Sequence, residues 1–68
     1  MTGRELREAR MRLGLTLEEM ARMIGYDGGL GRSQVSHLEA GRRTIRPAQL
    51  RLVEAYLDGY RPRDWPDK

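Results

Sequence analysis

The chain has 68 residues, so it can form one small domain that offers one binding surface rather than an enclosed catalytic cleft. It has no cysteine and a single histidine, which exclude disulfides, thiolate metal sites and a zinc site with three or four protein ligands. Twelve arginines and one lysine against ten acidic residues give a formal net charge of +3, which suits a polyanionic partner. We expect no metal, no cofactor and no enzymatic activity.

The first predicted helix runs from about residue 3 to residue 13. Thr2 can cap it, because Glu5 follows three residues later and the pair can satisfy two helix-end amides reciprocally. Gly14 follows the last apolar residue and is suited to end the helix. The helix has a narrow apolar stripe at Leu6, Ala9 and Leu13.

The second predicted helix begins after Thr16, which forms the same capping pattern with Glu19. Leu15 precedes the cap and Met20 occupies the fourth helical position, the arrangement of a hydrophobic staple. Gly25 is predicted to end this helix. The next seven residues, GYDGGLG, contain four glycines and predict an irregular turn in which Asp27 serves as a cap or turn residue.

A third helix is predicted over residues 32–39. It has two large apolar anchors, Val35 and Leu38, among short polar side chains, as expected of a helix that presents a surface. Gly41 ends it, and the basic segment 41–46 leads to Pro47, whose fixed φ suits the first turn of a fourth helix. We assign residues 1–60 to the domain and residues 61–68 to a short tail. Trp65 in that tail is expected to fold back over the core, to lie in a dimer interface or to be loose.

These residues resemble the Cro/C1-type (XRE-type) helix-turn-helix DNA-binding proteins of phages and bacteria. The segment LEEMARMIG is similar to the family pattern QEELAxxLG, and SQVSHLEAGRR is similar to SxVSxIExGxR. The resemblance implies an all-α, lambda-repressor-like domain of four to five helices with an extended turn. The helix over 32–39 would then enter the major groove of double-stranded DNA.

The resemblance also implies which residues meet DNA. The candidates for reading base edges are Arg32, Ser33, Gln34, Ser36 and His37, since arginine can pair with guanine and glutamine with adenine. The candidates for phosphate contacts are Thr16, Arg42, Arg43 and Arg46. His37 could equally be packed or solvated. Glu39 is expected to be structural and to pair with a nearby arginine or turn amide, because a carboxylate beside phosphates is repelled.

Two features depart from the family pattern. Leu17 stands where the family usually has a glutamine that touches the DNA backbone, so that contact is not expected here. The turn at 26–31 is about four residues longer than the family norm. It could tilt the recognition helix or bring Tyr26 and Asp27 to the DNA backbone.

The sequence therefore predicts a transcriptional repressor that binds an inverted-repeat operator as a homodimer. The apolar residues left for a dimer interface are Tyr56, Leu57, Tyr60 and Trp65. One alternative is an antitoxin, or a regulator of a phage or mobile-element operon, with a cognate toxin or another protein as partner. A second is a protein interaction module on the same scaffold. The amino terminus lacks the apolar run of a signal peptide or membrane span, so we expect a cytoplasmic protein without membrane contact.

Overall fold

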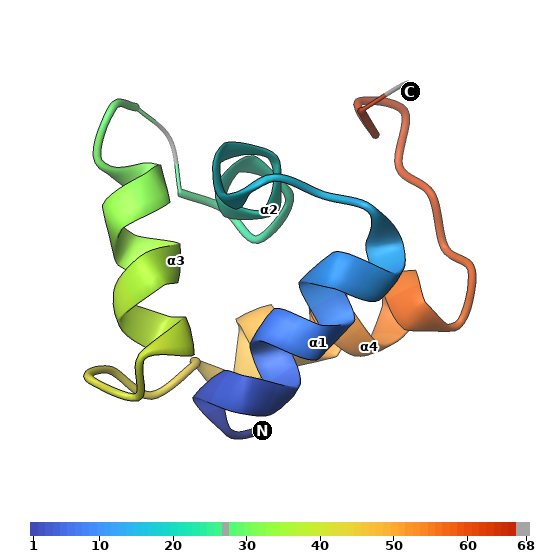
Figure 1. Cartoon of the computed structure of the whole chain (residues 1–68). Helices are drawn as coiled ribbons and strands as arrows, with labels where there is room; N and C mark the ends of the chain where they lie inside the picture. The colour runs from blue at the N-terminus through green and yellow to red at the C-terminus, as the bar shows by residue number, and fades with distance from the viewer. Residues whose placement is uncertain (27, 67–68) are drawn as a thin grey trace.

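The computed structural model describes residues 1–26 and 28–66 and contains four helices (Figure 1). They are α1 (Gly3–Leu13), α2 (Leu17–Met23), α3 (Gly31–Glu39) and α4 (Pro47–Leu57). The described residues include no strand, so the predicted all-α class is confirmed, with four helices. Asp27, for which a cap or turn role was expected, lies outside the described residues.

The helix ends follow the local signals of the sequence. Thr2 Oγ1 accepts the Glu5 N–H at 3.1 Å, and the Thr2 N–H donates to Glu5 Oε1 at 2.8 Å, which completes the predicted capping box of α1. The hydrogen bond that the Thr2 N–H donates to the carboxylate lowers the pKa of Glu5. Gly14 and Gly41 follow α1 and α3 with φ of 72° and 78°, a left-handed conformation that glycine adopts without strain.

One large side chain from each helix meets in the centre of the domain. Leu6, Met20, Val35 and Val53 come from α1, α2, α3 and α4, and each is at most 1% exposed. Their burial removes the apolar faces of all four helices from water, which is the main favourable term in folding. The core therefore fixes α2 and α3 relative to the rest of the chain.

Two polar side chains of α4 bind the end of α2. The buried Gln49 accepts the Arg46 N–H through Oε1 at 3.2 Å and donates from Nε2 to the Ile24 carbonyl at 3.4 Å. The Tyr56 hydroxyl donates to the Met23 carbonyl. These contacts satisfy carbonyls at the carboxyl end of α2, which would otherwise lack partners inside the protein.

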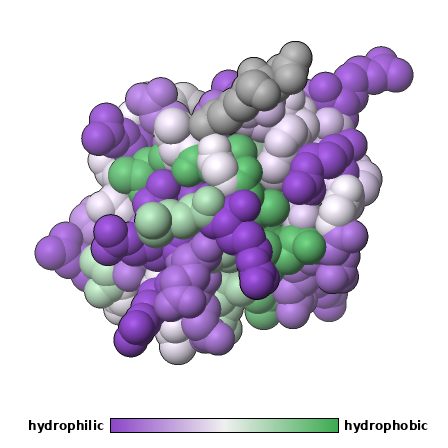
Figure 2. Space-filling model, turned by 45° about the vertical axis from the view of Figure 1, so that its right-hand side comes forward, coloured by the Kyte–Doolittle hydropathy of each residue, from purple (hydrophilic) through white to green (hydrophobic). Residues whose placement is uncertain are grey.

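The tail folds back over the core, which confirms the first of the three alternatives for Trp65. The Trp65 ring packs edge-on against Tyr56 with 5.1 Å between centroids, and the Arg61 guanidinium lies 4.3 Å from the Trp65 ring centroid. Arg61 also donates to the carbonyls of Tyr56 and Tyr60 at 2.8 Å each. Figure 2 shows the side of the molecule that carries the tail, where hydrophobic side chains are visible between hydrophilic ones.

Candidate nucleic-acid interface

Helices α2 and α3 pack closely against each other and form the centre of the candidate interface (Figure 1). Gly31, the first residue of α3, permits this approach: a Cβ built there would lie 2.9 Å from the Ala21 Cβ, closer than two such atoms tolerate. Val35 and Leu38 then bury the inner side of α3 against the core. The opposite side of α3 is left facing solvent.

Four predicted readout residues lie together on that solvent-facing side. Successive residues are rotated by about 100° around a helix axis, so these four span roughly 140°. Arg32, Ser33 and Ser36 are exposed and His37 is half-buried. Together with Leu17 from α2, they line a shallow hollow. The four side chains form what we call the α3 stripe: Arg32, Ser33, Ser36 and His37.

Gln34 does not lie on the α3 stripe. It is rotated by about 40° from the buried Leu38 and by about 100° from Ser33. Its Oε1 atom is buried without a hydrogen-bond partner among the described residues. Gln34 is half-buried like His37, so its Oε1 lies toward the protein while part of the residue stays at the surface beside the stripe.

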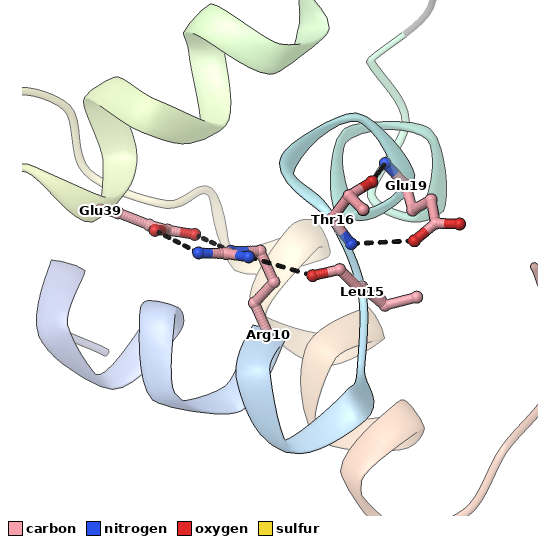
Figure 3. Close-up of polar contacts among 5 residues, drawn as sticks. All are labelled: Arg10, Leu15, Thr16, Glu19 and Glu39. Carbon is pink, nitrogen blue, oxygen red and sulfur yellow. Dashed lines mark hydrogen bonds and ion pairs between the residues drawn. The ribbon is translucent and has the colours of Figure 1, made fainter. Parts of the chain in front are cut away.

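An ion pair holds the carboxyl end of α3 (Figure 3). Arg10 Nε of α1 lies 2.6 Å from Glu39 Oε2, and Nη2 donates to Oε1 at 3.3 Å. Arg10 Nη1 donates to the Leu15 carbonyl at 3.0 Å, just before α2. The structural role expected for Glu39 is confirmed. Arg10 connects α1, the start of α2 and the end of α3, so it constrains how the two helices of the interface are held.

The amino terminus of α2 offers polar groups of mixed charge. Thr16 Oγ1 accepts the Glu19 N–H at 3.1 Å, and the Thr16 N–H donates to Glu19 Oε1 at 2.9 Å (Figure 3). The hydroxyl hydrogen of Thr16 remains available as a donor to a phosphate oxygen. The carboxylate of Glu18 lies in the same turn and lines a hollow with Arg32. A phosphate at this position would meet both a donor and a negative charge.

The basic segment after α3 is exposed. Arg42, Arg43 and Arg46 lie at the surface between α3 and α4. The described residues contain two ion pairs, Arg4–Glu8 and Arg10–Glu39, so the three arginines of this segment have no carboxylate partner within that part of the chain. Arg42 instead approaches the α3 stripe, with Nη1 3.4 Å from His37 Nδ1. Positive charge is thus concentrated at the carboxyl end of α3.

The residues predicted for a dimer interface are divided by their burial. Tyr56 is 3% exposed and belongs to the core, so it has little surface to offer a partner. Leu57 and Trp65 are half-buried, and Tyr60 is 55% exposed. The surface available for a second copy therefore consists of Leu57, Tyr60 and the outer part of Trp65.

The sequence interpretation missed two glycines that support the interface. Gly3 packs against the carboxyl end of α3, where an added Cβ would overlap the Glu39 carbonyl oxygen and lie 2.6 Å from that of Leu38. Nothing in the sequence near Gly3 indicates this long-range contact. Gly31 was assigned to the turn, and its close approach to Ala21 depends on how α2 and α3 pack, which the sequence around it does not indicate.

A helix-turn-helix family model, HTH_3, matches residues 6–65 of the chain. The chain belongs to this family. The helix-turn-helix is formed by α2, the turn and α3, and HTH_3 domains are DNA-binding regulators that are generally non-enzymatic. No curated protein and no solved structure matches the chain significantly. Within the described part of this helix-turn-helix chain, no helix is long and apolar enough to cross a bilayer.

Proposed function

We propose that this helix-turn-helix protein is a transcriptional repressor that binds a specific operator through the α3 stripe. The observation that carries the proposal is the composition of that stripe: Arg32, Ser33, Ser36 and His37 are brought to one side of α3, and each can hydrogen-bond to a base edge. Occupancy of an operator that overlaps a promoter is sufficient to block polymerase, so repression needs no further activity of the domain.

We assign the phosphate contacts to the segment that follows the stripe. Arg42, Arg43 and Arg46 are exposed and lie beside the carboxyl end of α3. Arginine guanidinium groups pair well with phosphate oxygens, and such contacts position a protein on DNA without reading its sequence. Thr16 adds a hydroxyl donor at the start of α2. Gln34 is left out of the readout set, because its Oε1 is buried.

We further propose that two copies bind an inverted repeat. One small module makes too few contacts for tight specific binding at cellular salt, and a dimer doubles them. Leu57 and Trp65 are half-buried and Tyr60 is 55% exposed, so they supply apolar surface for a second copy. A cognate toxin or another protein is the alternative occupant of this surface.

Fluorescence anisotropy with a labelled duplex, measured over a range of salt concentrations, tests the division between readout and phosphate contact. Arg32→Ala should weaken binding to the preferred sequence by about 1–3 kcal/mol and leave binding to unrelated DNA nearly unchanged. Arg43→Ala should weaken binding to both duplexes, and it should reduce the slope of log affinity against log salt concentration by about one, the value for one phosphate contact. Equal effects of the two substitutions on both duplexes would refute the assignment, and a flat salt dependence would favour a protein interaction module.

A further inference from the structure

Leu30 is the most exposed large hydrophobic side chain of the described residues. It is 72% exposed, compared with 62% for Met11, 55% for Tyr60 and 39% for Met1. A single exposed apolar side chain is ordinary and carries no argument by itself. Its position immediately before α3 distinguishes Leu30 from the other exposed hydrophobic residues.

Leu30 occupies the N-cap of α3, where leucine is one of the least favourable residues. The N-caps of α1 and α2 are Thr2 and Thr16, and each forms a complete capping box. Leu30 makes no side-chain hydrogen bond to the helix. The N-cap of α4, Arg46, also forms no side-chain hydrogen bond to its helix, but α3 is the helix that carries the readout candidates. A local rule broken without a structural gain is typical of functional positions.

The backbone of Leu30 continues the helical rotation of α3. Its φ of −96° and ψ of −2° are nearly helical, and its carbonyl accepts the Gln34 N–H at 3.1 Å as in the first turn of a helix. Extended by the rotation of about 100° per residue, Leu30 lies about 40° from Gln34 and about 60° from Ser33 around the axis, and about 20° from His37, which is two turns further along. Leu30 therefore lies at the edge of the stripe, one turn before Ser33 and Gln34.

We propose that Leu30 is a specificity residue that contacts the methyl group of a thymine in the major groove, at the edge of the half-site. The 5-methyl of thymine is the apolar feature of the major-groove edges, and apolar side chains read it by direct contact. Arg32, Ser33, Ser36 and His37 suit polar edges, and Leu17, the apolar residue that shares their hollow, is half-buried on α2, whereas Leu30 is exposed. The proposal rests on the proposed function and adds one base position to it.

The test uses the duplex that the full chain selects from random DNA. Each thymine of that duplex is replaced in turn by deoxyuridine, which removes the methyl group and keeps every hydrogen-bonding group. At one thymine position of each half-site, this replacement should weaken binding of the unsubstituted protein by about fourfold, the effect of losing the burial of one methyl-sized group. Replacement at the other thymines should have little effect. Leu30→Ala should bind the original duplex more weakly and should be insensitive to that replacement.

Two further variants separate base contact from folding. Met11→Ala removes a comparably exposed side chain from α1, away from the stripe, and should retain the full fourfold sensitivity. Leu30→Gln keeps a side chain of similar length but replaces its apolar end, so it should abolish the sensitivity while the melting temperature stays close to that of the unsubstituted protein.

If Leu30→Ala keeps the sensitivity of the unsubstituted protein, or if no thymine replacement affects binding, the inference is refuted while the proposed function stands. If the unsubstituted protein selects no sequence at all, both fail.

Discussion

The ion pair between Arg10 and Glu39 allows the geometry of the interface to be tested through stability. The two side chains are only 17% and 10% exposed. Removing one partner leaves a charge in a partly buried site, which costs about 3–5 kcal/mol when burial is complete. Because some exposure remains, we expect about 2 kcal/mol for Glu39→Gln. Arg10→Met should cost about 3 kcal/mol, since it also removes the donor to the Leu15 carbonyl.

These losses are large for a domain of this size. A chain of 68 residues is expected to have a total unfolding free energy of roughly 3–10 kcal/mol. Urea denaturation at neutral pH, followed by circular dichroism, measures each variant and the double variant. The double variant should be about as stable as Arg10→Met alone, which gives a coupling energy of about 2 kcal/mol.

The pair Arg4–Glu8 provides a matched control on the surface of α1. Its atoms are 3.3 Å apart and its side chains are 90% and 67% exposed. Exposed pairs of this spacing contribute about 0.3–0.5 kcal/mol. A coupling energy for Arg10 and Glu39 as small as that of the control would refute the claim that this contact holds α3 in place.

Two other substitutions test the packing around α3 and α4. Gly3→Ala should destabilise the domain by about 1–3 kcal/mol, because the new Cβ overlaps a carbonyl at the end of α3, whereas Gly29→Ala has open space and should be nearly neutral. Thermal unfolding compares the two variants, and equal melting temperatures would contradict the contact between Gly3 and the end of α3. Burial raises the pKa of Tyr56 above the ordinary 10.0. The Tyr56 hydroxyl therefore loses its proton at a lower pH in the unfolded chain than in the folded one, and the free energy of unfolding falls as the pH rises above about 10. Tyr56→Phe should lower the free energy of unfolding by about 1–2 kcal/mol at pH 7, because it leaves the Met23 carbonyl unpaired. It should also lose less stability at alkaline pH than Tyr60→Phe, which keeps the Tyr56 hydroxyl. An equal alkaline loss in the two variants would refute the claim that Tyr56 causes it.

The parts of the fold that depend on neighbouring residues could be predicted from the sequence. The capping boxes at Thr2 and Thr16 and the glycines at positions 14 and 41 act within one helical turn, and the structure has them as expected. The periodic apolar residues predicted the buried faces for the same reason, since a helix places residues three and four apart on one side. The start of α3 was predicted to within one residue.

Contacts between distant residues could be predicted only in kind. The sequence indicated that Glu39 pairs with an arginine or a turn amide, and it gave no reason to choose Arg10, 29 positions away. Gln34 was grouped with the readout residues because the resemblance places it on the recognition helix and glutamine can pair with adenine. The burial of its Oε1 depends on how α3 packs against the rest of the domain, which the neighbouring residues do not indicate.

Selection from random double-stranded DNA, followed by sizing of the complex, tests whether the α3 stripe reads a DNA sequence. The unsubstituted protein should enrich an inverted repeat and form a complex with two copies of the chain. Arg32→Ala should lose the preference at one base pair in each half-site and keep the others. Enrichment of no sequence, or an Arg32→Ala selection identical to that of the unsubstituted protein, would contradict the account.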